Sequence, residues 1–86
     1  MIKFDIVQKI GKLGSPNKDG WTKELNIVRW NGGKAKVDVR YWSEDHEEMS
    51  KGITLAFEEA DKFAELWAAA DIDRNIPTIS EDPGEF

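Results

Sequence analysis

Cysteine is absent from the 86-residue chain, and histidine and tyrosine each occur once. Without thiols the protein has neither disulfides nor thiolate metal ligands. A cysteine nucleophile is excluded for the same reason, and Ser43, Ser50 and Ser80 stand in no nucleophile motif. Gly32-Gly33 precedes no helical pattern, so it makes no phosphate-binding loop. The residues therefore favour a binding protein over an enzyme.

Long apolar runs are also missing, so no segment is suited to span a membrane. The amino terminus carries charged residues where a signal peptide needs an apolar stretch, and we expect a cytoplasmic protein, with association with the nucleoid as an alternative. A chain of this length makes one domain with a small core, for which dimerisation is a reasonable expectation. We place the domain at residues 1–72 and an acidic, flexible tail at 73–86.

Charge is unevenly divided along the chain, although the net formal charge is -5. Up to Ser43 there are nine basic and four acidic residues, whereas three basic and 13 acidic residues follow. Sign asymmetry of this kind separates a surface that attracts polyanions from one that repels them.

Hydrophobic periodicity predicts four strands. Alternating apolar residues mark strands over 2–10, 21–30 and 34–42, and KGITL adds a short strand over 51–55. The second segment alternates imperfectly, which requires a bulge or apolar side chains on both faces. Asn31-Gly32-Gly33 predicts a tight hairpin turn.

The segment from 57 to 70 has the apolar spacing of an amphipathic helix. Ala56 is a poor helix cap, and Thr54 is the alternative. We therefore expect an α+β fold, a four-stranded antiparallel sheet followed by one C-terminal helix, in which the helix covers one face of the sheet.

The strand over 34–42 is the most informative segment for function. Its alternation directs Ala35, Val37, Val39 and Tyr41 to one side, which we expect to be core, and Lys34, Lys36, Arg40 and Trp42 to the other, which we expect to be exposed. Cations neutralise phosphates, and an exposed indole stacks on an unpaired base, so this face suits a single-stranded nucleic acid. Alternatively, the cations merely keep an outer face soluble, with Asp38 paired to one of them and Trp42 folded under a loop.

His46 lies in the acidic segment SEDHEEM. This segment could bind a metal ion only if its carboxylates converged on one point. A consecutive acidic run in a loop is more often simply solvated. We therefore predict neither a metal site nor a cofactor.

The run WNGGKAKVDVRYWSEDHEEMSKGITL and the helix that follows resemble the transcriptional coactivator family called positive cofactor four, especially its bacterial YdbC-like branch. The segment GWTKEL, from Gly20 to Leu25, also resembles this branch. The resemblance implies a homodimer of the fold expected above, with helices packed between subunits. It further implies sequence-tolerant binding of single-stranded DNA, with a role in transcription regulation, replication or repair.

Carried over by position, the resemblance implies that the same cationic and aromatic strand binds nucleic acid. It adds the aromatic before the turn and the lysine of the KG motif, and neighbouring basic residues extend the surface. The predicted set is Trp30, Lys34, Lys36, Arg40, Trp42, Lys51, Arg29 and Lys23. Two alternatives remain open, a protein-interaction module anchored by tryptophans and a single-stranded RNA binder.

Overall fold

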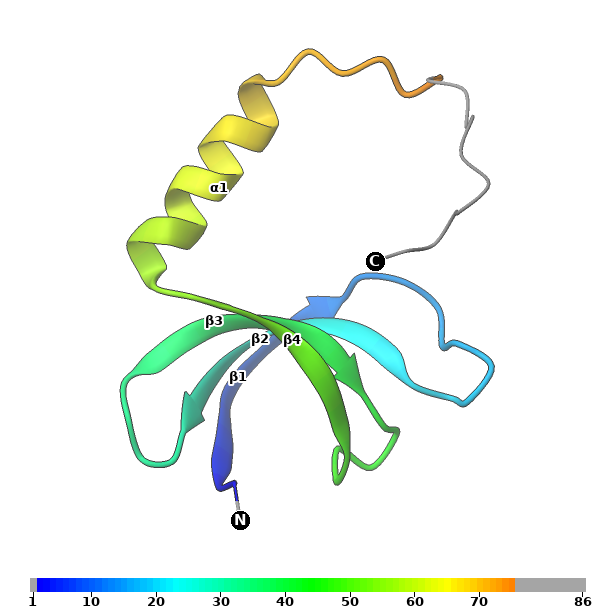
Figure 1. The fold of residues 1–86 in the computed structure, drawn as a ribbon, viewed down its shortest axis with the longest axis vertical. Coiled ribbons are helices and arrows are strands. Elements are labelled where there is room, and N and C mark those ends of the chain that lie inside the picture. Colours follow the sequence, from blue (N-terminus) through cyan, green and yellow to red (C-terminus); the bar gives the residue numbers. More distant parts are fainter. Residues whose placement is uncertain (1, 76–86) are drawn as a thin grey trace.

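The computed structural model describes residues 2–75, which fold into four strands and one helix. The elements are β1 (Phe4–Lys12), β2 (Thr22–Trp30), β3 (Ala35–Trp42), β4 (Met49–Leu55) and α1 (Phe57–Ala69). All four strands form one antiparallel sheet in the order β1-β2-β3-β4 (Figure 1). The predicted fold class and element order are confirmed, with β1 and β4 displaced by about two residues from their predicted starts. The predicted tail lies outside the described residues, except for 73–75.

The sheet is curved into an arch, with α1 beyond its convex side (Figure 1). Pairing between β2 and β3 runs without interruption from Thr22 opposite Trp42 to Arg29 opposite Ala35. The irregularities lie instead in β1, where the register shifts twice against β2, and between β3 and β4. The imperfect alternation of β2 therefore arises from apolar side chains on both faces, and not from a bulge in that strand.

The turn at Asn31-Gly32 and the position of Gly52 each restrict which residue fits. Asn31 and Gly32 both have positive φ, 52° and 74°, and the amide of Gly33 donates to the carbonyl of Trp30, so the predicted hairpin turn is confirmed. Gly52 has no room for a side chain, because a Cβ atom would overlap the carbonyl oxygen of Val39 and the side chain of Arg40. The KG motif thus allows close packing of β4 on β3.

The burial of the two sheet faces differs from the expectation. Trp42 and Val28, on the concave face, are fully buried, together with the polar Thr22, Glu24, Asn26 and Asp38. On the convex face Val37 and Val39 are only half-buried, and Ile53 is 59% exposed. The prediction that the apolar side of β3 is the core is therefore wrong within one chain. On the cationic side Lys34 and Lys36 are exposed as predicted, whereas Arg40 is half-buried and Trp42 is buried. Curvature makes concave side chains converge, whereas it spreads those on the convex side.

Helix α1 does not cover the sheet as predicted. None of its residues is buried, and its apolar stripe, which includes Phe63, Leu66 and Trp67, is 53% to 62% exposed. Ala56 precedes the helix, and its amide donates to the carboxylate of Glu59. Thr54 is not the cap, because its hydroxyl donates to Asp38.

Candidate nucleic-acid interface

An aromatic cluster fills the concave side of the sheet. The rings of Trp30 and Trp42 stack nearly parallel, 9° apart, with centroids separated by 6.5 Å. Phe4 packs on both, and the ring of His46 lies 5.6 Å from that of Trp42. Trp42 is completely buried, so its predicted exposure is wrong and the loop that carries His46 closes over it. Trp30 is half-buried and is the indole at the surface of this cluster.

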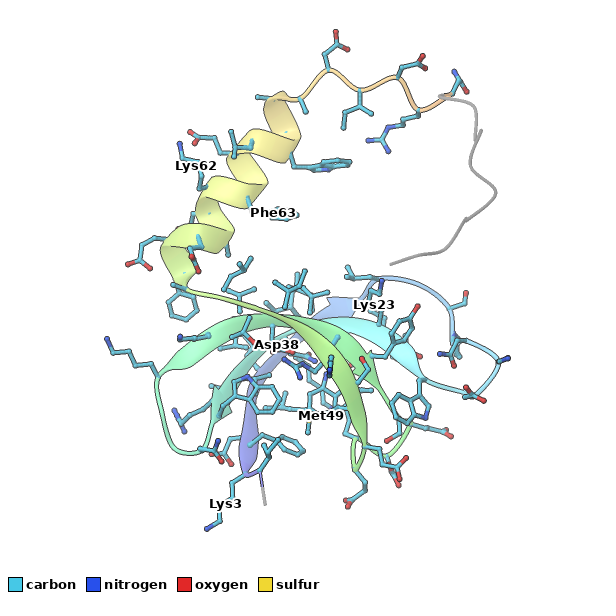
Figure 2. All side chains as sticks on the ribbon, viewed as in Figure 1. Lys3, Lys23, Asp38, Met49, Lys62 and Phe63 are labelled. Atoms are coloured by element: carbon cyan, nitrogen blue, oxygen red, sulfur yellow. The ribbon has the colours of Figure 1, made fainter. Side chains whose placement is uncertain are left out.

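Arg40 is held in place by an ion pair with Asp38, the residue labelled on the sheet in Figure 2. Its Nε and one terminal nitrogen donate to the two carboxylate oxygens of Asp38, at 2.6 and 2.8 Å. Asp38 is fully buried and also accepts from Thr54 at 2.9 Å, while the other terminal nitrogen of Arg40 donates to the Ser50 carbonyl. The guanidinium lies 4.5 Å from the Trp30 ring centroid, within the range of a cation–π contact. Arg40 is therefore a neutralised, flat support for Trp30.

A pocket opens beside this pair. Three predicted site residues, Trp30, Arg40 and Lys51, line it together with Ile2, Asn31, Met49, Ser50 and Thr54. The indole Nε1 of Trp30 is buried, and within residues 2–75 it has no hydrogen-bond partner. The pocket thus combines an aromatic face, a guanidinium and an exposed ammonium, which are groups that suit a base and its phosphate.

The remaining predicted residues lie elsewhere. Arg29, Lys34 and Lys36 line a second depression between the β2–β3 turn and the start of α1, which Phe57 and Glu58 complete. Lys34 and Lys36 are exposed, whereas Arg29 lies 3.8 Å from Asp5. Lys23 is on the convex face, with its Nζ 5.1 Å from the ring centroid of Tyr41. The structure therefore brings Trp30, Arg40, Trp42 and Lys51 together and leaves the other four apart from them.

Sequence reasoning missed a buried polar cluster on the same face. Both carboxylate oxygens of Glu24 lie 3.0 Å from Nε2 of His46, and Oε1 also accepts from the Asn26 amide. Burial acts to raise the pKa of Glu24, but the hydrogen bonds from Asn26 and His46, with the charges of His46 and Lys12, outweigh it and place that pKa below its usual value. The sequence did contain a signal for this cluster, because polar residues occupy alternate positions of β2 on the face that also carries Trp30.

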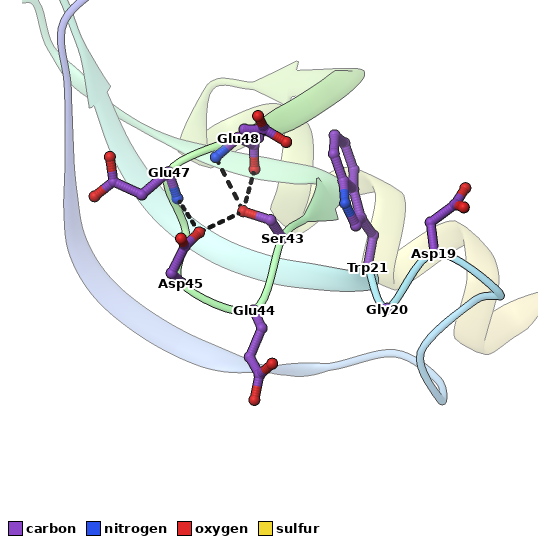
Figure 3. Close-up of a pocket in the computed structure, with 8 residues that line it drawn as sticks. All are labelled: Asp19, Gly20, Trp21, Ser43, Glu44, Asp45, Glu47 and Glu48. Carbon is purple, nitrogen blue, oxygen red and sulfur yellow. Dashed lines mark hydrogen bonds between the residues drawn. The ribbon is translucent and has the colours of Figure 1, made fainter.

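The acidic loop makes a separate cavity, shown in Figure 3, at the end of the sheet. Trp21 and Asp19 line it together with Ser43, Glu44, Asp45, Glu47 and Glu48. Ser43 donates to Asp45 and accepts from the amide of Glu48, so a hydrogen-bonded turn holds these carboxylates. Hydrogen bonds from the Glu47 amide and the Ser43 hydroxyl lower the pKa of Asp45. In the described part of the chain, no group of three or more histidine or carboxylate residues is placed to hold a metal ion.

The fold and this face define an α+β domain with a strongly curved antiparallel sheet and an aromatic, polar concave side. Residues 17–66 match the family model described as Transcriptional Coactivator p15 (PC4). An uncharacterized protein from Treponema pallidum (strain Nichols) is 35% identical over 80 residues, which cover 93% of this chain and 82% of that protein.

The chain therefore belongs to the Transcriptional Coactivator p15 (PC4) family, and the resemblance seen in the sequence is confirmed. The bacterial relative is consistent with a bacterial branch, while the YdbC-like assignment stays a prediction. Membership supports the expectation of a nucleic-acid-binding, non-enzymatic protein. No helix in residues 2–75 is long and apolar enough to cross a membrane.

Proposed function

We propose that the protein binds single-stranded DNA on the concave side of its sheet, with little dependence on sequence. The observation that carries this proposal is the pocket in which Trp30, Arg40 and Lys51 meet. An aromatic ring offers any unpaired base a stacking surface, whereas a duplex hides its base faces. Family membership supports the same activity.

Within the interface the residues have different tasks. Trp30 stacks on a base, and Lys51 neutralises a neighbouring phosphate. Arg40 supports Trp30 through the cation–π contact, and the buried Trp42 lies parallel to its ring with the centroids 6.5 Å apart. Lys34 and Lys36, which make no ion pair in the part of the chain that the structure describes, supply phosphate contacts beyond the turn. Arg29 and Lys23 add only to the surrounding positive potential.

The protein acts as a homodimer in this proposal. The convex face of the sheet and the apolar stripe of α1 both expose large apolar side chains, Ile53 on the sheet and Phe57, Phe63 and Trp67 on the helix. Exposed apolar surface of this extent is typical of a protein interface. A second copy of the same chain covers it and leaves the concave faces free. Sedimentation equilibrium is expected to give twice the chain mass, and a monomer at micromolar concentration would contradict this assembly.

The test of function is a titration with oligothymidylate, a hairpin duplex and an RNA strand of equal length, followed by fluorescence anisotropy. We expect tight, salt-sensitive binding of the oligothymidylate and much weaker binding of the duplex. Equal affinity for RNA would extend the activity to that polymer, because stacking and phosphate contacts do not read the 2′-hydroxyl. Failure to bind any of the three would refute the proposal and favour a protein-interaction module. We further propose a cytoplasmic location and a role in transcription regulation, replication or repair.

A further inference from the structure

A second cavity on the concave side lies between β1 and β2, away from the Trp30 pocket. It is lined by Lys9, Ile10, Lys12, Glu24, Asn26 and His46. None of these residues lines the Trp30 pocket, and none belongs to the predicted binding set. The cavity thus places two ammonium groups beside a buried carboxylate and a buried amide.

Buried hydrogen-bond acceptors distinguish this cavity. Glu24 and Asn26 are 5% and 1% exposed. The amide nitrogen of Asn26 donates to Glu24, which leaves Oδ1 of Asn26 without a partner among residues 2–75. Glu24 is ionised at neutral pH, because its pKa lies below the usual value, so it offers only acceptors. A buried acceptor without a partner is costly, so a donor that a molecule brings into the cavity is stabilised by contact with Oδ1 of Asn26.

The strand that borders the cavity is irregular. β1 is an edge strand, and its second register shift falls between Lys9 and Gly11, directly at the cavity. Bulges of this kind occur next to binding sites, where they interrupt pairing and redirect side chains. An edge strand with a broken ladder separates locally at less cost than a central strand, which gives a ligand a route to Asn26.

We propose that this cavity is a guanine-reading subsite for the bound strand, which rests on the proposed function. Guanine presents two adjacent donors, N1–H and the N2 amino group. One meets the unpartnered Oδ1 of Asn26, and the other meets a remaining lone pair of the Glu24 carboxylate, whose oxygens also contact Nε2 of His46. Lys9 and Lys12 take the neighbouring phosphate. Thymine has one N–H between two carbonyl groups, and a carbonyl oxygen would then face the Glu24 carboxylate. Adenine and cytosine have one amino donor beside a ring acceptor. The protein is therefore tolerant of sequence at Trp30 and selective at one further nucleotide.

The test compares oligothymidylate with the same strand carrying one central guanine. The wild-type protein is expected to bind the guanine strand about tenfold more tightly, the effect of about one to two added hydrogen bonds. Asn26→Leu removes Oδ1 and is expected to abolish that ratio while retaining affinity for oligothymidylate. Thr22→Val is the matched control, because Thr22 lies on the same face of β2, is 5% exposed and does not line the cavity. Thr22→Val is expected to keep the ratio of the affinities for the two strands.

A measurement on the unaltered protein guards against misfolding of the variant. In 15N-resolved NMR spectra, deoxyguanosine monophosphate is expected to shift the side-chain amide signals of Asn26, whereas thymidine monophosphate leaves them in place. Equal affinity for the two strands, or a guanine preference that survives in Asn26→Leu, would overturn the inference while leaving DNA binding intact. If neither strand binds, the proposed function and this subsite fail together.

Discussion

The ion pair between Asp38 and Arg40 predicts that Arg40 contributes little charge to DNA binding. For single strands, each neutralised phosphate changes the slope of log affinity against log salt by about 0.7. Arg40 donates to both oxygens of the fully buried Asp38, so the pair carries no net charge. Replacing both residues by alanine is therefore expected to leave the slope unchanged. Affinity falls, because Trp30 loses its cation–π partner, which contributes about 0.5 to 2 kcal/mol.

The single and double variants also differ in stability. Arg40→Ala leaves the Asp38 carboxylate buried and unpaired, which costs about 3 to 5 kcal/mol. That loss is large against the roughly 5 to 15 kcal/mol by which a small domain is stable. The double variant removes both charges and is expected to be more stable than Arg40→Ala, which urea denaturation of the complete cycle measures.

The assay is fluorescence anisotropy with oligothymidylate over a series of salt concentrations. Lys36→Ala is the matched control, because Lys36 lies on the same face of β3 and is exposed. This control is expected to flatten the slope by about 0.7. An equal flattening in the double variant would refute the reasoning, since it would show that Arg40 leaves Asp38 to meet a phosphate.

Three further predictions concern other parts of the molecule. Trp30→Ala is expected to weaken oligothymidylate binding by about 1 to 3 kcal/mol with no change in salt slope, and a changed slope in the same anisotropy assay would contradict stacking. Glu24→Gln is expected to flatten the acid dependence of stability. Because the folded-state pKa of Glu24 lies below its ordinary 4.5, its ionised form contributes stability above that pH that is lost as pH falls through the folded value. Urea midpoints at neutral and acidic pH measure this, and identical profiles would count against it. Phe63→Glu is expected to yield monomers in sedimentation, while Lys62→Gln, one residue away and on an exposed position, leaves the dimer intact.

The turn and the faces of the strands were predictable because their signals are local. Positive φ at Asn31 and Gly32 follows from residue type, and the period of two fixes which side chains share a face. The burial of Trp42 was not predictable in this way. It depends on the curvature of the whole sheet, which brings Phe4 from β1 and His46 from a distant loop against the same ring.

The residues of the candidate interface were predictable only as a set of types. Trp30, Arg40 and Lys51 come together in one pocket, which adds geometry to the sequence pattern. The pairing of Arg40 with Asp38 was present in the sequence as an alternative, and the structure confirms it. No sequence rule distinguished a paired Arg40 from a free one, because the pairing depends on whether the Asp38 carboxylate is buried. The position of α1 was equally undetermined, since an amphipathic stripe shows that a surface must be covered but not by which chain.

Charge on the concave face is largely cancelled where it is buried and free where it is exposed. Arg40 is paired with Asp38, and Glu24 lies against Nε2 of His46, so each buried charged side chain of the arch has a polar partner. The exposed lysines at positions 34, 36 and 51 lie outside these pairs. Attraction of a polyanion and positioning of its bases are therefore assigned to different residues. This division reconciles the proposed DNA binding with a net charge of -5, because long-range attraction depends on the local surface and not on the sum. For the proposed guanine subsite, it implies that high salt lowers the affinity for both strands without changing their ratio.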